Sequence, residues 1–180
     1  MNTTMKNILR TLAATALIAS IGSVHADKTT ANLFVTANVS SNCTITAPIA
    51  VAFGEYDPAS GVNSTAAGAV SVACAKSSIL TLWIGLSDGA HADAGQRNML
   101  GDTGDKLAYN LMQPVTGAAG AACPAYGTGT AWTNLLAGGL TIAPPPGKAA
   151  RSFSVCGEMA AGQDVSVGSY IDTVVATINF

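Results

Sequence analysis

Apolar and polar residues alternate along much of this sequence, and the alternation is clearest in its last stretch, residues 168–180. From Tyr170 onward the parity that contains Asp172 is otherwise apolar, whereas the other parity combines Thr and Asn with Ile171 and Val175. A period of two in a β-branched run predicts a strand with one face on a core. The core-facing residues of this strand are expected to be Tyr170, Val174, Ala176, Ile178 and Phe180. A strand that ends on an apolar residue is expected either to close its own sheet or to accept a partner.

Residues 31–45 alternate in the same way. Their apolar parity consists of Ala31, Leu33, Val35, Ala37, Val39, Cys43 and Ile45. Phe34 is the exception, because it is a large apolar residue on the polar parity. The run is longer than the usual strand of about five or six residues. The excess predicts that one part of the segment belongs to its own domain and the other part acts elsewhere.

Shorter stretches of the same kind predict further strands, with loops rich in Gly, Pro and Asp between them. The strands are expected at residues 69–74, 79–86, 107–112 and 152–156, and irregular loops at residues 87–106 and 116–130. Residues 133–142 fit no single pattern. Because no helical periodicity follows the first 26 residues, short strands separated by turns predict one all-β sandwich domain.

The start of the chain has the features of a secretory signal peptide. Lys6 and Arg10 are followed by an apolar run over residues 11–21 and by a small-residue site that ends at Ala26. This order predicts cleavage after Ala26 and export to the periplasm. The apolar run is too short to span a bilayer, which takes about 20 residues.

Cleavage at that site would leave 180 − 26 = 154 residues, enough for one domain with a core. The full chain has 8 basic and 10 acidic residues, and loss of Lys6 and Arg10 leaves 8 − 2 = 6 basic residues and a net charge of −4. This acidic balance argues against nucleic acid or an anionic membrane as a partner.

All the cysteines of the chain follow the signal peptide; they are Cys43, Cys74, Cys123 and Cys156. Export places them in an oxidising compartment, so two structural disulfides are expected. Four cysteines allow three pairings, and their spacing does not choose among them. A metal site is disfavoured, since no two cysteines are close in sequence and His91 is the only histidine after Ala26.

Two motifs with possible chemistry are better explained as loops. Residues 85–89 match the G-x-S-x-G pattern of a hydrolase nucleophile, but no helix is predicted after them and His91 follows too closely for a triad. An acidic cluster in the same region has spacing that does not fit a calcium loop; it consists of Asp88, Asp93, Asp102 and Asp105. No catalytic residue, cofactor, metal or small-molecule substrate is therefore assigned, and the protein is not expected to be an enzyme.

Three C-terminal stretches resemble the signature of the spore coat protein U domain family: residues 152–157 (SFSVCG), 160–163 (AAGQ) and 167–180 (VGSYIDTVVATINF). Upstream pieces at residues 42–45, 53–58, 71–74, 97–99 and 107–111 fall in the family's order. Cys156 departs from the pattern, which commonly has an aromatic residue there. The family includes subunits of archaic, Csu-type chaperone-usher pili as well as the spore coat protein that names it.

The resemblance implies an immunoglobulin-like β-sandwich that lacks its final strand and is completed by a donor strand. A periplasmic chaperone would lend that strand first, and the N-terminal extension of the next subunit would then replace it. The resemblance also implies a disulfide between Cys43 and Cys74, which leaves Cys123 to pair with Cys156. Residues 27–36 would be the donor extension and residues 37–180 the pilin domain. The side chains expected to fill the partner's groove are Ala31, Leu33, Val35 and Ala37.

The expected function is thus that of a structural subunit of a surface pilus, which polymerises by donor-strand exchange for adhesion and biofilm formation. Its partners would be identical or related subunits, the periplasmic chaperone and an outer-membrane usher, and its final location the cell surface. An alternative is a secreted coat or matrix protein whose sandwich is completed by its own N-terminal strand. A sugar-binding or enzymatic β-sandwich is a third hypothesis, for which the sequence offers no site.

Overall fold

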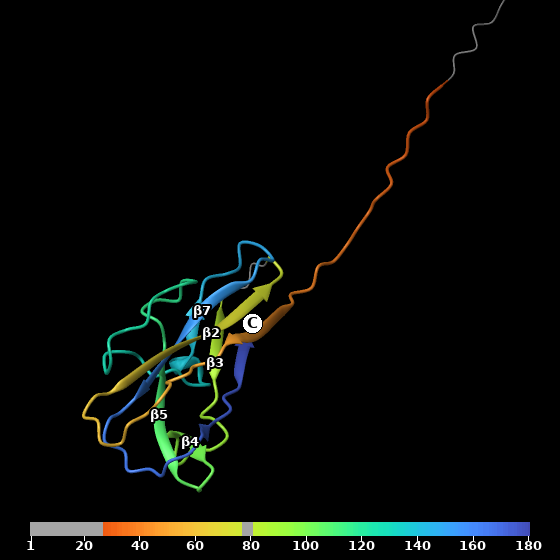
Figure 1. Ribbon diagram of the computed structural model, residues 1–180. Helices are drawn as coiled ribbons and strands as arrows, with labels where there is room; N and C mark the ends of the chain where they lie inside the picture. Colours follow the sequence, from red (N-terminus) through yellow and green to blue (C-terminus); the bar gives the residue numbers. More distant parts are fainter. Residues whose placement is uncertain (1–26, 77–80) are drawn as a thin grey trace, which may run out of the picture. The chain divides into compact units, whose positions relative to one another are not determined.

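The computed structural model describes residues 27–76 and 81–180, whose regular secondary structure is almost entirely β (Figure 1). The elements are β1 (Cys43–Ile49), β2 (Ser64–Cys74), β3 (Leu82–Leu86), β4 (Arg97–Gly101), β5 (Lys106–Met112), the short 3-10 helix η1 (Leu136–Gly138), β6 (Leu140–Ile142), β7 (Arg151–Met159), β8 (Tyr170–Ile171) and β9 (Ala176–Asn179). The predicted signal peptide and its cleavage site at Ala26 lie outside the described residues. No helix within the two described ranges is long and apolar enough to cross a membrane.

The strands form two antiparallel sheets with a shared core. One sheet has the order β1-β2-β7-β5-β4-β8 and the other the order β6-β3-β9. Phe153 of β7 and Ile84 of β3 face each other's sheets and are both 0 % exposed. Trp132 is equally buried, and its indole N–H donates to the Ile84 carbonyl oxygen at 2.8 Å. The all-β sandwich is confirmed: β2, β5 and β7 cover three of the predicted strands, and β3 covers most of the described part of the strand predicted at residues 79–86.

Tyr170 opens the segment that crosses from the first sheet to the second. Its hydroxyl donates to the Ser166 carbonyl oxygen at 2.7 Å. This bond fixes the chain at the point where it leaves the first sheet. Two packed antiparallel sheets with a chain segment that passes between them agree with the predicted immunoglobulin-like sandwich.

The prediction of one continuous strand from Tyr170 onward is wrong, because the strand is interrupted at residues 172–175. β8 pairs with β4 in the first sheet, where Gly101 is opposite Tyr170, whereas β9 pairs with β3 in the second. A chain that changes sheets must leave one ladder before it joins the next. Phe180, predicted to face the core, is 55 % exposed beyond the end of β9.

The first strand of the domain begins later than the sequence predicted. Residues 27–38 are the described part of one compact unit. They form no helix or strand, and their side chains are exposed. Val39–Phe180 is the second unit, and its first strand, β1, begins at Cys43. The alternating residues upstream of Cys43 therefore do not form a strand in this chain's own sheets. An isolated strand lacks the neighbour that would supply its ladder hydrogen bonds.

β4 lies inside the stretch that the sequence predicted to be a loop, residues 87–106. The prediction was wrong because this strand carries polar side chains that are buried, with Arg97 and Asn98 each 6 % exposed. The Arg97 guanidinium donates to three backbone carbonyl oxygens, those of Leu86 at 3.1 Å, Ser87 at 2.7 Å and Trp132 at 2.7 Å. Burial lowers the pKa of Arg97, although neighbouring acidic groups and Tyr109 partly oppose this. Backbone acceptors thus allow a cation in a strand that hydropathy does not reveal.

Two disulfides connect Cys43 to Cys74 and Cys123 to Cys156, which are the pairings that the family resemblance implied. The first joins residues that are also register partners at the start of β1 and the end of β2. The second fastens the loop after β5 to the face of β7 turned away from the core, where Ser154 Oγ donates to the Ala121 carbonyl oxygen at 2.7 Å.

Removing the second disulfide by the double change Cys123→Ser and Cys156→Ser is expected to lower the free energy of unfolding by about 3.5 to 4 kcal/mol, because the bond closes a loop with a sequence separation of 33. Urea denaturation of the oxidised wild type and the double variant measures this difference. The loop should also become sensitive to limited proteolysis near Gly127, whose amide bonds Glu158 at 3.0 Å. An unchanged urea midpoint would contradict the expected stabilisation.

Candidate strand-binding groove

One edge of β9 has no hydrogen-bonded partner strand among the described residues, although β1 lies near this strand. On its other edge it pairs with β3, and just before β9 the Val175 carbonyl oxygen accepts from Ser87 N at 2.9 Å and the Thr173 carbonyl oxygen from Ala90 N at 3.1 Å. In an antiparallel ladder, alternate residues point their backbone groups to opposite sides. The N–H and C=O groups that point to the open edge are therefore those of Val174, Ala176 and Ile178.

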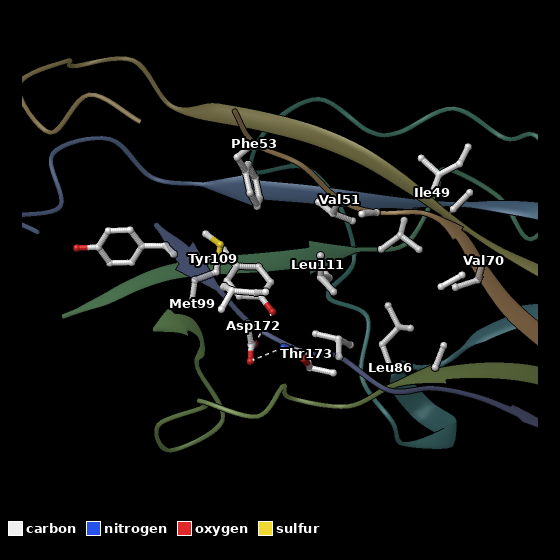
Figure 2. A pocket seen from close by; sticks show the side chains of 18 residues that line it. Ile49, Val51, Phe53, Val70, Leu86, Met99, Tyr109, Leu111, Asp172 and Thr173 are labelled. Atoms are coloured by element: carbon white, nitrogen blue, oxygen red, sulfur yellow. Dashed lines mark hydrogen bonds between the residues drawn. The ribbon is translucent and has the colours of Figure 1, made fainter. Parts of the chain in front are cut away.

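A groove of about 420 Å³ lies beside this edge (Figure 2). One wall is formed by the end of β1 and the irregular segment that follows it, residues 47–53, and the other is the C-terminal segment, residues 170–176. The floor consists of buried side chains of the core; it includes Val70, Leu86, Leu111 and Val155. The groove thus joins an apolar floor to a row of unpaired backbone groups.

Two glycines leave room for the first wall to pack directly on the sheet. A Cβ atom on Gly68 would lie 2.7 Å from Val51 Cγ2, and one on Gly157 would lie 2.5 Å from Val51 Cγ1. Val51 therefore packs directly on the backbones of β2 and β7. Phe53 follows and meets the Tyr109 ring edge-on, with 6.2 Å between the ring centres. This packing keeps residues 50–53 out of the space beside β9.

A second hollow of about 670 Å³ continues the groove beyond Phe53. The two share Val51, Phe53, Met99 and Tyr170 as lining residues. The lining of the second hollow is more polar, since it includes Glu55 and Ser166. The groove is therefore most apolar next to β9 and becomes polar away from it.

Asp172 fixes the C-terminal wall at the point where the chain changes sheets. Its side chain is 2 % exposed, and one of its oxygens accepts from the backbone N–H of Ala90 at 2.9 Å, His91 at 3.2 Å and Thr173 at 2.8 Å. The other oxygen accepts from the Tyr109 hydroxyl at 2.7 Å, and His91 Nδ1 lies 3.1 Å from the first. Burial alone would raise the pKa of Asp172, but these hydrogen bonds outweigh it and lower the pKa.

The same carboxylate raises the pKa of Tyr109, whose burial is the larger cause. Tyr109 belongs to β5, whereas Asp172 belongs to the segment between β8 and β9. Figure 2 shows the two side chains meeting across the groove. The bond therefore connects the C-terminal wall to the floor.

The G-x-S-x-G stretch of the sequence, residues 85–89, packs against and hydrogen-bonds the segment around Asp172. Gly89 has φ +91°, and a Cβ atom on it would lie 2.0 Å from Asp172 Oδ2, so no other residue fits there. Ser87 Oγ accepts from Val175 N at 2.9 Å. No hydrogen bond joins Ser87 to His91 within the described chain, so these side chains do not form a nucleophile and base pair.

Three of the four acidic residues in the predicted cluster bind separate parts of the chain. Asp93 pairs with Lys106, Asp102 accepts from Ser169 N and Asp105 from Ser166 N. The described residues contain no group of three or more His, Cys, Asp or Glu side chains placed to hold a metal ion.

The predicted site residues fall into two groups in the structure. Val174, Ala176, Ile178 and Tyr170 are partly buried and pack against the core. The second group lies in the N-terminal unit, which ends at Asn38, and all its side chains are exposed; it consists of Ala31, Leu33, Val35 and Ala37. Their donor role stays a prediction. Sequence reasoning missed Asp172, although its position as the one polar residue on an apolar parity was the available signal.

The chain is similar to known proteins at three levels. The sequence model described as the Spore Coat Protein U domain matches residues 29–177. Protein U of Myxococcus xanthus is 33 % identical over 189 residues, which cover 98 % of each chain. The fold is similar to that of a chain in the crystal structure of the CsuC-CsuE chaperone-tip adhesion subunit pre-assembly complex from archaic chaperone-usher Csu pili of Acinetobacter baumannii, with a TM-score of 0.52 and 18 % identity. That match covers 79 % of this chain but only 40 % of the other, and it bears on the fold alone.

Proposed function

This chain belongs to the spore coat protein U domain family, and from that membership we propose that it is a pilus subunit that polymerises by donor-strand exchange. It is a structural protein of the pilus or spore-coat type. The finer assignment, a subunit that receives a strand from one neighbour and gives one to another, is supported by the groove beside β9.

The observation that carries this function is the combination of an open strand edge with an apolar floor. Val174 and Ala176 offer backbone donors and acceptors at the edge of the groove. A β-strand that adds to such an edge gains main-chain hydrogen bonds, and its alternate side chains enter the apolar space. An unpaired apolar edge also favours aggregation, which explains why such a subunit would need a chaperone before assembly.

The proposed donor is residues 27–36 of another copy. Ala31, Leu33 and Val35 lie on one parity and are the side chains that would enter the groove, followed by Ala37. Leu33 and Val35 are 89 % and 87 % exposed. Burial of each would contribute roughly 1.5 to 3 kcal/mol before the cost of ordering the segment.

The proposed partners follow from this assembly. They are identical or related subunits, a periplasmic chaperone that covers the groove first and an outer-membrane usher. The Csu structure, which is a chaperone and subunit complex, supports the chaperone by fold analogy. The proposed location is a fibre at the cell surface, with adhesion and biofilm formation as its role.

The test compares the mature protein with a chain lacking residues 27–36, each co-expressed with the candidate chaperone. The full chain is expected to form ladders that resist SDS, and the shortened chain to remain a chaperone-bound monomer. Ladders from the shortened chain would contradict the donor role.

A second candidate function has its own support in the match to Protein U over 98 % of its length. In that case the protein would be a secreted coat protein whose own N-terminal strand completes the sandwich. Stable monomers of both chains without a chaperone would favour this second function over the pilus.

A further inference from the structure

The exposed charged side chains of the domain are divided between its two ends. At one end β1 begins at Cys43, and Val72 of β2 is opposite Arg151 at the start of β7. At the other end β2 begins and β7 stops, with Ser64 opposite Met159, and the turn between β4 and β5 lies beyond them. Figure 1 shows β4 and the C-terminus at opposite ends of the domain.

Basic side chains lie at the end where β1 begins. Lys76 follows the end of β2, Lys148 lies in the connection from β6 to β7, and Arg151 opens β7. Arg151 Nη1 donates to the Ala143 carbonyl oxygen at 2.8 Å, and its Nη2 is buried with no hydrogen-bond partner in the described chain. No ion pair among the described residues neutralises any of these three cations. This end, here termed the basic end, therefore has uncompensated positive charge.

Carboxylates gather at the opposite end, on three connections that are bonded to one another. The Gln163 amide donates to the Tyr56 hydroxyl at 2.7 Å, and the Ser166 amide donates at 2.8 Å to a carboxylate of the turn between β4 and β5. The carboxylates at this end that have no cationic partner in the described chain are those of Glu55, Asp57, Asp102, Asp105 and Asp164. Lys106 is also there, but it pairs with Asp93. This end is termed the acidic end.

The groove and the donor segment belong to opposite ends of the domain. The second hollow, which continues the groove, is lined by Glu55 and Ser166 and thus reaches the acidic end. The donor segment is joined to the basic end, because the chain enters the domain through β1 at Cys43. Five residues separate Ala37 from Cys43, and a chain of this length spans at most about 20 Å. The basic end of a donating subunit must therefore lie close to the groove that its donor fills.

The charges distinguish between the two ways in which the copies could meet. If the Ala37 end of the donor lies toward the acidic end of the receiving subunit, a basic end faces an acidic end. If the donor runs the other way, two basic ends face each other, and like charges repel. The second arrangement also could not continue along a fibre, since each basic end would have to meet both of its neighbours.

On the premise that the proposed strand exchange occurs, we infer that the basic end of each subunit docks on the acidic end of another copy and that this attraction speeds capture of the donor. Exposed ion pairs add little to the strength of a complex. Their attraction acts on the rate of encounter, and salt screens it. The ends of the subunit therefore recognise a second copy before the strand enters the groove.

Reversal of the charges at each end tests this docking. The basic-end variant has Lys76→Glu with Lys148→Glu, the acidic-end variant has Glu55→Lys with Asp164→Lys, and the combined variant has all four changes. These side chains are exposed, so the domain is expected to fold normally, and urea midpoints check this. The readout is the rate at which chaperone-bound mature chains form SDS-resistant ladders at low and high salt.

The combined variant is the matched control for net charge. The mature wild type has a net charge of −4, so the basic-end variant has −4 − 4 = −8, the acidic-end variant −4 + 4 = 0 and the combined variant −4 again. If net charge controlled assembly, the first two variants would change the rate in opposite directions. If the ends dock, both variants slow assembly, and the combined variant recovers because its reversed ends are again complementary.

At low salt, each single-end variant is expected to form ladders about tenfold more slowly than the wild type, and the combined variant to return to within about twofold. At about 1 M salt the four rates should converge. A combined variant slower than either single-end variant, or a wild-type rate that does not change with salt, would overturn the docking while the ladders themselves uphold the strand exchange. Absence of ladders from the wild type would overturn both.

Discussion

Chains with Leu33→Asp are expected to form no SDS-resistant polymer, whereas chains with Asn32→Asp should assemble like the wild type. Both changes add one negative charge to the same exposed segment. In the proposed assembly, only the first would place a carboxylate against the apolar floor formed by residues such as Val70 and Leu111. An ionised carboxylate without a partner is costly to bury, so assembly should weaken at least about 100-fold, or about 2.7 kcal/mol.

Ladder formation by the two variants under identical expression provides the measurement. Both should fold and bind the chaperone, since the change lies outside the domain that begins at Val39. Equal ladders from both variants would show that Leu33 does not enter the groove. Loss of ladders from both would instead indicate that overall charge, rather than parity, controls assembly.

Asp172→Ala is expected to lower the free energy of unfolding of the domain by about 2 to 3 kcal/mol, because partly buried hydrogen-bond donors lose their acceptor. The change leaves the Tyr109 hydroxyl and the amides of Ala90 and His91 without their acceptor. A matched control is Asp164→Ala, because Asp164 is an exposed carboxylate on the same C-terminal stretch. Urea denaturation should show a change below about 0.5 kcal/mol for the control. Similar midpoints for both variants would contradict the role of Asp172.

The acid stability of the protein should depend on the same residue. The pKa of Asp172 is lowered in the folded state, so its contribution is fully present above the unfolded value of about 3.9 and is lost as the pH falls through the folded value. Below about pH 4, the Asp172→Asn variant should therefore lose less unfolding free energy than the wild type. Asp105, whose pKa is lowered by hydrogen bonds from Ser166, should retain some acid dependence in both proteins. Urea midpoints measured across this pH range decide the outcome.

The sequence allowed prediction of the strands in which apolar and polar residues alternate. β2, β5 and β7 have one apolar parity each, so their strands and the all-β class could be inferred. β4 could not, because the Arg97 guanidinium is satisfied by carbonyl oxygens from distant segments, Leu86 and Trp132 among them. Contacts of that kind leave no local periodicity.

The groove, too, could be predicted only in part. The C-terminal wall was predictable from its apolar parity, but the wall formed by residues 47–53 was not. Its position depends on Val51 fitting against Gly68 and Gly157, which are distant in sequence and become adjacent only when β2 pairs with β7. Asp172 was recognised as an exception to the pattern, yet its partners other than Thr173 lie 63 to 82 residues away.

The Cys43–Cys74 disulfide has a mechanical consequence for a fibre built in the proposed way. Tension between neighbouring subunits would enter each domain through the residues that precede β1. The bond lies at the first residue of β1 and joins it to the last residue of β2. A pull on the N-terminal segment is therefore transmitted covalently to β2, which pairs with β7 over nine positions. β1 cannot be peeled from its sheet from that end, and the load is shared along the longest ladder of the sandwich.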